Sequence, residues 1–232
     1  MAVPDGMWPE PGFMGLLDAG RRRELLALGS RRSFPPGAAL VLEGSTDSTV
    51  FVLVDGWVKV LGSSADGGTS LLAVRGRGDL IGELAAIDSR PRSATVIAAR
   101  TTAATEVTAV AFRGFLRAHP GSAEALQRTV AGKLRSATRY RIDAGGGSAT
   151  VRLARTLDTL VRTHGLAVDG GLRIDMPLSQ SDLASLTGIS DASAQRALRR
   201  LRLDGTIITG YRGIEVRRPA ALRAVAEQRA QP

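Results

Sequence analysis

The sequence predicts an α+β protein with an N-terminal antiparallel β-roll (jelly-roll-like), a long central helix and a C-terminal winged helix-turn-helix. Three observations support this class. Short β-rich segments separated by glycine turns fill residues 33–112, a pattern typical of small barrels and sandwiches. An amphipathic stretch follows at 121–144, and a capped helix pair with a hairpin occupies 179–216. A chain of 232 residues is long enough for two cores.

Composition excludes several kinds of chemistry. The chain has no cysteine, which excludes disulfides, thiolate metal sites and cysteine-bound iron–sulfur clusters. The two histidines, His119 and His164, are too few for a multi-histidine metal site, and we expect no metal and no haem. Hydrolytic enzymes usually need a metal cluster or an activated nucleophile. Neither is visible here, so we do not expect an enzyme.

The positive charge is concentrated in the second half of the chain. Residues 1–118 have 13 basic and 12 acidic side chains, whereas residues 119–232 have 18 basic and 10 acidic ones. A neutral half followed by a basic half predicts a sensor joined to a domain that binds a polyanion such as nucleic acid. The alternative is a basic face that is merely solvated.

The N-terminal residues predict neither export nor membrane insertion. Residues 1–20 lack the charged and apolar regions of a signal peptide, and no apolar run in the chain approaches ~20 residues. We therefore expect a cytoplasmic protein without a membrane segment. Residues 1–14 contain three prolines and two glycines and predict a loose lead-in, and residues 16–28 predict a short helix.

The first half contains the expected strands. Asp55-Gly56 stands between the β-rich runs 49–54 and 57–61 and predicts a hairpin, because such dipeptides favour tight turns between strands. The remaining expected strands are residues 39–42, 70–74, 95–99 and 103–112, followed by a short helix at 113–118.

The most informative stretch of this half is residues 81–96. Gly82 allows backbone to approach a ligand closely. Residues 84–87 can form one helical turn, whose free N–H groups favour an anion. Arg92 offers a guanidinium fork to a phosphate, and Ser93 offers a hydroxyl donor. The alternative is an ordinary turn in which the preceding glutamate forms an ion pair with Arg92.

In this order, the residues resemble the phosphate-binding cassette of cyclic-nucleotide-binding domains. The resemblance implies that Glu83 accepts a hydrogen bond from a ribose 2′-OH, and that Arg92 and Ser93 bind a cyclic phosphate. The implied site consists of Gly82, Glu83, Leu84, Ala85, Arg92 and Ser93, with Val60 and Leu72 against the base and Thr138 on the central helix.

Residues 121–144 predict the long helix. Its apolar positions are spaced four, four and three residues apart, a narrow stripe that suits a seam between two copies of the chain. The alternative is that the stripe packs on its own barrel. Residues 145–148 read Gly-Gly-Gly-Ser and predict either a hinge or an inert linker. The stripe consists of Leu126, Val130, Leu134 and Ala137.

The second half predicts a helix-turn-helix. A helix at 149–165, a turn at 165–171 and a strand at 172–176 come first. Ser179 and Asp182 then form a capping-box pattern. After a glycine turn, Ser190 caps a helix whose buried positions are Ala194, Ala197, Leu198 and Leu201, with Ala192, Arg196, Arg199 and Arg200 on the opposite face.

Such a helix fits the major groove of DNA, where arginine reads guanine or holds phosphate. A hairpin at 206–216, with Arg212 at its tip, predicts a wing that contacts phosphate, and residues 219–228 predict a terminal helix. The alternative is a plain helical hairpin with a basic face. The candidate DNA contacts are Gln180, Ser190, Asp191, Ser193, Arg196, Arg199, Arg200 and Arg212.

Together the two halves resemble the cyclic-AMP receptor protein/FNR (Crp/Fnr) family of transcription regulators, over about residues 33–214. The resemblance implies a homodimer that binds double-stranded DNA, with RNA polymerase as a further candidate partner. Two departures matter. Ala137-Thr138 stands where the family has a threonine–serine pair that contacts adenine, so the first hydroxyl is missing. Asp191-Ala192 stands where many members have base-reading arginine and glutamate, which predicts a different operator.

The expected organisation is a sensor domain at 1–118, a dimerisation helix and hinge at 119–147, and a DNA-binding domain at 148–232. The expected function is transcription regulation controlled by cyclic AMP or cyclic GMP. An alternative within the same fold is a ligand-independent regulator whose Glu83 and Arg92 pair with each other. A nonspecific architectural DNA binder is a further alternative, which predicts similar affinity for any duplex.

Overall fold

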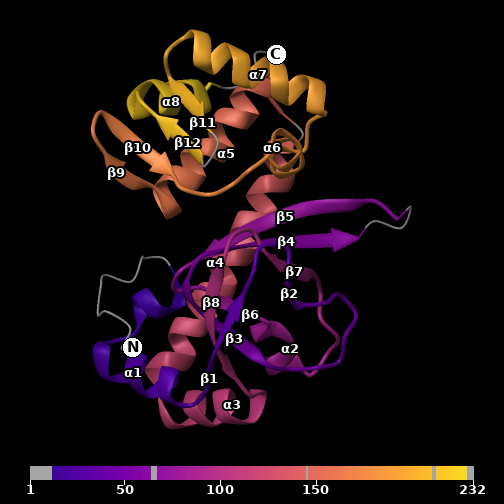
Figure 1. Cartoon of the computed structure of the whole chain (residues 1–232), viewed down its shortest axis with the longest axis vertical. Helices are drawn as coiled ribbons and strands as arrows, with labels where there is room; N and C mark the ends of the chain where they lie inside the picture. Colours follow the sequence, from indigo (N-terminus) through magenta and orange to yellow (C-terminus); the bar gives the residue numbers. More distant parts are fainter. Residues whose placement is uncertain (1–11, 64–66, 145, 211–212, 229–232) are drawn as a thin grey trace. The chain divides into compact units, whose positions relative to one another are not determined.

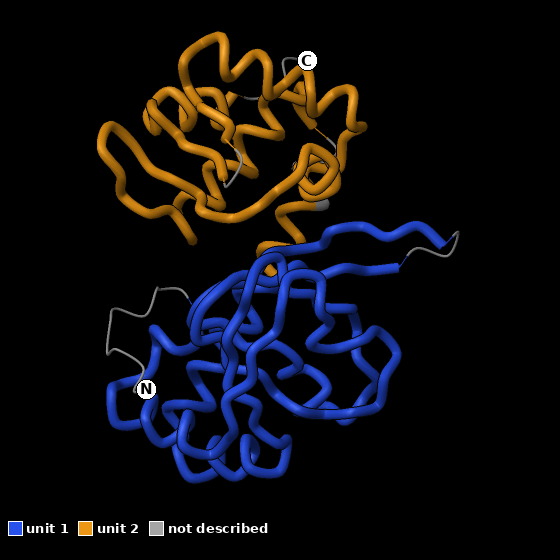
Figure 2. Tube along the Cα trace, in the orientation of Figure 1, with its two compact units in different colours: residues 1–133 blue, residues 134–232 orange. Residues whose placement is uncertain are grey.

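The structure, a computed structural model, describes residues 12–63, 67–144, 146–210 and 213–228. The chain divides into two units, residues 1–133 and 134–232 (Figure 2), and each is described below by itself. The expected α+β class is confirmed: strands dominate the first unit, a long helix follows, and the second unit holds a helix-turn-helix (Figure 1).

Unit 1 contains two four-stranded antiparallel sheets whose buried faces form its core. Along strands such as β7, buried side chains alternate with partly buried ones, which explains why one face of each sheet turns inward. The first sheet has the order β1 (Ser30–Phe34), β8 (Thr102–Val107), β3 (Val50–Asp55) and β6 (Leu80–Ile81). The second has the order β2 (Ala39–Val41), β7 (Thr95–Ala98), β4 (Trp57–Ser63) and β5 (Thr69–Gly76).

The hairpin predicted at Asp55-Gly56 is wrong. Strands β3 and β4 belong to different sheets: β3 pairs with β8 and β6, while β4 pairs with β5 and β7. Gly56 has a φ of 91°, which suits a tight connection of either kind. A side chain there would lie 2.6 Å from the Cα of Thr102. The Asp-Gly dipeptide specified the sharp turn, but only long-range strand pairing decided that the chain changes sheets.

The boundary between the last predicted strand of this unit and the helix after it also differs from expectation. The strand predicted to reach residue 112 ends at Val107, because helix α3 (Ala109–Ala118) begins there. The hydroxyl of Thr108 accepts a hydrogen bond from the N–H of Ala111 and caps this helix. Phe112 and Phe115 of α3 are buried. Strands β1 and β6 were not predicted, since a mostly exposed strand and a two-residue strand carry little hydrophobic pattern.

The N-terminal segment contributes to the core. The loose lead-in predicted for residues 1–14 is wrong at Phe13 and Met14, whose side chains are fully buried in a 3₁₀ turn (Phe13–Leu16); residues 1–11 lie outside the described part. The rings of Phe13 and Phe112 pack edge to face with centroids 6.4 Å apart. Helix α1 (Ala19–Ala27) follows, capped by the carboxylate of Asp18.

The central helix α4 (Pro120–Ala144) carries its apolar stripe in two different environments. Leu126 is 5% exposed and Val130 packs against the core of unit 1, as the own-barrel alternative predicts. Beyond the unit boundary, Leu134 is 67% exposed and Ala137 is also exposed, as is Ile142, which lies outside the predicted stripe, at 63%. Only the second half of the stripe is therefore available for a partner.

Unit 2 is built around helix α5 (Ala149–His164), which packs against the other helices of the unit. The predicted turn at 165–171 is wrong in part, because residues 166–168 form a strand that extends the sheet to the order β11-β12-β10-β9. The remaining elements are β9 (Leu166–Val168), β10 (Gly171–Ile174), α6 (Gln180–Thr187), α7 (Asp191–Leu203), β11 (Ile207–Gly210), β12 (Gly213–Val216) and α8 (Pro219–Ala226).

Candidate functional site

The cassette segment begins at a glycine that no other residue can replace without rearrangement. Gly82 has a φ of 82° and precedes helix α2 (Glu83–Asp88). A Cβ at this position would overlap the guanidinium of Arg92 and lie 2.7 Å from the carbonyl oxygen of Thr49. The fold therefore places Gly82 directly against Arg92, two residues that are ten positions apart in the chain.

Arg92 is buried, with 4% of its surface exposed, and has several hydrogen-bond partners. Its Nη1 donates to the carbonyl oxygen of Gly82 at 3.0 Å, and its Nη2 donates to the carbonyl oxygen of Thr49 at 2.6 Å. The guanidinium also forms an ion pair with Asp47. Hydrogen bonding from Arg92 lowers the pKa of Asp47 below its ordinary value, even though burial opposes the shift.

Glu83 is buried beside a lysine of the central helix. The Oε1 atom of Glu83 lies 2.9 Å from the Nζ of Lys133, which also donates to the carbonyl oxygen of Leu80 at 3.0 Å. The suggested Glu83–Arg92 ion pair is therefore wrong: each of these charges has a different partner, Lys133 and Asp47 respectively. The carboxylate of Glu83 faces Lys133 on α4, whereas the guanidinium of Arg92 faces Asp47 in the segment after β2. Each buried charge is therefore neutralised by a different part of the fold.

The other predicted ligand contacts differ in exposure. Ser93 and Leu84 are exposed and Ala85 is buried. Val60 of β4 is half-buried and packs against the sheet core, whereas Leu72 of β5 is 54% exposed. Glu83 provides a carboxylate at the start of α2, and Arg92 provides a fixed cation beside Gly82. A sugar hydroxyl can donate to the carboxylate, and a phosphate can accept from the guanidinium.

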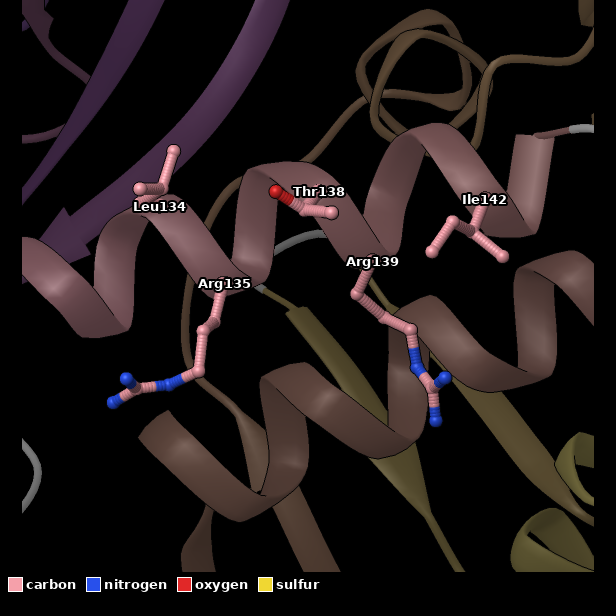
Figure 3. A pocket seen from close by; sticks show the side chains of 5 residues that line it. All are labelled: Leu134, Arg135, Thr138, Arg139 and Ile142. Atoms are coloured by element: carbon pink, nitrogen blue, oxygen red, sulfur yellow. The ribbon is translucent and has the colours of Figure 1, made fainter.

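Thr138 belongs to unit 2 and lies on the exposed face of α4. With Leu134, Arg135, Arg139 and Ile142 it lines a shallow hollow of about 460 Å³. Figure 3 shows both arginines extending from the same side of the helix, while Leu134 and Thr138 point elsewhere. The hollow is therefore lined by apolar, hydroxyl and cationic side chains that all belong to α4.

In the helix-turn-helix, the caps hold the two helices in place. Ser179 and Asp182 form the predicted capping box at the start of α6, with the hydroxyl and the carboxylate each accepting from the other residue's backbone N–H. Ser190 caps α7 by accepting from the N–H of Ser193. The Nε2 of Gln180 donates to the carbonyl oxygen of Asp191 at 3.2 Å. This bond joins the N-terminal ends of α6 and α7.

The outward face of α7 carries the expected polar residues. Arg196, Arg199 and Arg200 are exposed, as is Asp191. The Nη2 of Arg196 donates to the hydroxyl of Ser193 at 2.9 Å, and the Nε of Arg200 lies 3.1 Å from a carboxylate oxygen of Asp204. Arg212 lies outside the described residues.

Sequence reasoning missed four residues that stabilise these sites. Asp47 and Lys133 hold the cassette charges, as described above. Tyr140 of α4 donates from its hydroxyl to the carbonyl oxygen of Ser185 in α6. Arg152 of α5 donates to the carbonyl oxygens of Thr187 and Gly188, at 2.9 and 2.6 Å. All four contacts are long-range in sequence, so a local pattern gave no signal for them.

Within the described ranges, no cluster of three or more His, Asp or Glu side chains could hold a metal ion. Over the same residues, every helix is too short or too polar to span a lipid bilayer.

Comparison with known proteins assigns each half separately. Residues 31–119 match the model of the cyclic nucleotide-binding domain, and residues 151–225 match the Crp-like helix-turn-helix domain. The chain is 31% identical over 170 residues to a CRP-like cAMP-activated global transcriptional regulator of Mycobacterium tuberculosis. The matched region covers 71% of this chain and 74% of that protein. The chain is 27% identical over 196 residues to the cyclic AMP receptor protein of Thermus thermophilus, covering 84% and 88%.

Solved structures agree on the fold. FixK2 from Bradyrhizobium japonicum superimposes with a TM-score of 0.74 at 24% sequence identity, over 87% of this chain and 99% of that one. At this identity the likeness concerns the fold alone, and it includes both the strand-rich half and the helix-turn-helix.

Proposed function

The chain belongs to the CRP/FNR family of transcription regulators, and from this we propose that it is a homodimeric, sequence-specific DNA-binding protein controlled by a cyclic nucleotide. The first unit would bind the nucleotide, and the helix-turn-helix would bind the operator. We infer no catalytic step, and we expect the protein where its DNA is, in the cytoplasm. An assay of cyclic AMP and cyclic GMP hydrolysis tests the expectation that the protein catalyses no reaction on these nucleotides.

The buried guanidinium of Arg92 carries the proposal for the ligand. It is fixed by the carbonyl oxygens of Gly82 and Thr49, and it stands beside a glycine turn. A positive charge that is already positioned loses little conformational freedom when it binds a phosphate. Glu83 would accept from the ribose 2′-OH, with Ser93, Leu84 and Ala85 completing the contact and Val60 and Leu72 beside the base.

A second candidate, a ligand-independent regulator, has one observation in its favour. Asp47 already neutralises Arg92, and Lys133 already neutralises Glu83. A folded cassette with satisfied charges does not depend on a nucleotide for its stability. A cyclic nucleotide must then displace Asp47 from Arg92 and Lys133 from Glu83, or bind beside them. The two candidates differ in whether the protein binds a cyclic nucleotide in this way.

The exposed second half of α4 supports the proposed homodimer. Leu134 and Ile142 are each more than 60% exposed on this helix, and Leu134 belongs to the narrow apolar stripe that suits a seam between two copies of the chain. Leu134→Asp should produce monomers in sedimentation velocity. Val110→Asp is a matched control, because Val110 is 70% exposed on a different helix, α3. Dimers that survive Leu134→Asp would place the interface elsewhere.

Calorimetric titration with cyclic AMP and, separately, cyclic GMP tests the ligand. We expect saturable binding to the native protein and its loss in Arg92→Ala. Arg90→Ala is the matched control, since Arg90 is exposed two residues away and should bind normally. Thermal unfolding of both variants checks that they fold. Absence of heat and of a thermal shift with both nucleotides would support the ligand-independent candidate.

Operator binding is tested with DNA selected from a random pool, with and without each nucleotide. A regulator selects a two-fold symmetric site, because a dimer presents two recognition helices. An architectural binder enriches no sequence at fixed salt. The contacts proposed for α6, α7 and the wing are Gln180, Ser190, Asp191, Ser193, Arg196, Arg199, Arg200 and Arg212.

A further inference from the structure

Gln195 is a polar residue on the outward face of α7, the proposed recognition helix, and it has not been assigned a role above. The buried positions of α7 are 194, 197, 198 and 201. Residues 192, 195, 196 and 199 repeat the same i, i+3, i+4, i+7 spacing two positions earlier, and all four are exposed. They therefore form one continuous surface over the first turns of the helix, composed of Ala192, Gln195, Arg196 and Arg199.

The side chains on this surface are held differently. The guanidinium of Arg196 donates to the hydroxyl of Ser193, which is itself hydrogen-bonded to the hydroxyl of the capping residue Ser190 at 3.0 Å. In the described part of the chain, the carboxamide of Gln195 forms no hydrogen bond with another residue. Its donor and acceptor are thus both available, on the face that carries the arginines.

We propose that Gln195 reads an adenine in the operator. A neutral carboxamide gains little from the phosphate backbone, where binding is governed by charge. It matches the adenine edge in the major groove, where its oxygen accepts from N6 and its nitrogen donates to N7. The inference rests on the proposed function, because it requires that α7 enters the major groove.

The neighbouring residues define the rest of the half-site. Arg196 follows Gln195 directly and matches guanine, through its O6 and N7 atoms. Ala192 lies one helical turn before both residues, and its exposed methyl group matches the C5-methyl of thymine. The surface therefore predicts that the adenine read by Gln195 lies next to the guanine read by Arg196.

The test compares selected operators of the full-length protein and of Gln195→Glu, in the presence of cyclic AMP and, separately, of cyclic GMP. Glutamate has the same shape but only accepts hydrogen bonds, so it matches the N4 donor of cytosine. We expect one position of each half-site to change from adenine to cytosine, with about tenfold weaker binding to the original site. Gln195→Ala should make the same position indifferent.

Gln127→Glu is the matched control, because it makes the same chemical change at an exposed position of α4 in unit 1. Its selected operator should equal that of the native protein. If the native protein selects a symmetric site and Gln195→Glu selects the same one, the assignment of Gln195 is wrong while the proposed function stands. If the native protein selects no site with either nucleotide, the proposed function fails and the base assignment fails with it.

Discussion

Arg92, which is almost fully buried, forms an ion pair with Asp47, whose side chain is 50% exposed. The two residues are 45 positions apart and meet because the segment after β2 passes over the end of the cassette. The pair keeps a buried cation neutral without a ligand. An incoming phosphate would therefore approach a guanidinium that already has one anionic neighbour, and Asp47 becomes a determinant of both stability and ligand affinity.

Asp47→Asn should lower the free energy of unfolding at neutral pH by about 1 kcal/mol, a modest figure because the carboxylate is half exposed. Arg92 lowers the pKa of Asp47 from its ordinary value of 3.8. Because the pKa of Asp47 is lower in the folded state than in the unfolded state, its ionised carboxylate contributes its full stabilisation above about pH 4. This contribution is lost as the pH falls through the pKa of the folded state. Urea unfolding between pH 7 and pH 3 should show the two proteins converging in acid.

Asp55→Asn is the control for that series, since the pair of Asp55 with Arg100 is 3.7 Å long and the carboxylate is 72% exposed. It should change stability by less than about 0.5 kcal/mol. A constant difference between native protein and Asp47→Asn at every pH would show that the carboxylate charge is not what stabilises Arg92.

Lys133→Met should destabilise the protein by about 2 kcal/mol, because it leaves the carboxylate of Glu83, only 5% exposed, without its cation. Lys133→Arg keeps the charge and should cost less. Glu83→Gln is the second single variant, and the double variant Lys133→Met with Glu83→Gln removes both charges. We expect the double variant to lose less free energy of unfolding than the sum of the losses in the two single variants. Denaturant unfolding of the native protein, the two single variants and the double variant measures this coupling; strictly additive losses would refute it.

Tyr140→Phe should cost about 1 kcal/mol, the typical net value of one hydrogen bond, here to the carbonyl oxygen of Ser185. Burial raises the pKa of Tyr140 above its ordinary 10.0. The folded state then holds the phenol proton more tightly than the unfolded state, so the phenol's contribution is complete below pH 10 and declines as the pH rises further. Chemical unfolding at pH 8 and pH 10.5 checks the sign.

Absorbance at the phenolate band identifies that proton directly. The chain has two tyrosines, so Tyr211→Phe leaves Tyr140 as the single titrating phenol. Its transition should lie above that of a free tyrosine in the native protein and return to the free value on unfolding. An unshifted transition would contradict the burial that raises the pKa of the Tyr140 phenol.

Arg196→Ala and Arg199→Ala should weaken operator binding in two distinguishable ways. If Arg196 reads a base, its truncation relaxes sequence preference at one position, at a cost of about 1–3 kcal/mol. If Arg199 binds a phosphate, its truncation weakens binding to all sequences alike and reduces the salt dependence by about one counterion. Arg23→Ala, exposed on α1, is the control. Equal weakening on specific and random DNA for Arg196→Ala would remove its base-reading role.

The site was predictable where it follows a local pattern. Gly82, Glu83 and Arg92 lie within one short segment, and the face of α7 follows from helical periodicity once Ser190 is recognised as its cap. The partners of these groups were not predictable, because Asp47 and Lys133 approach from other elements. Gln195 was overlooked, although the spacing of Arg196 and Arg199 already placed it on the same surface.

By itself, the sequence determined the order of elements and the kind of groups that each presents: a glycine turn with a nearby cation, a capped pair of helices and a basic second half. These are local properties, set by backbone preference, capping and side-chain period. Only the tertiary structure decided that β3 and β4 lie in different sheets, that the two halves of the α4 stripe have different environments, and that Asp47 and Lys133 neutralise Arg92 and Glu83. Such pairings depend on which distant segments the core brings together, and a local pattern does not encode that choice.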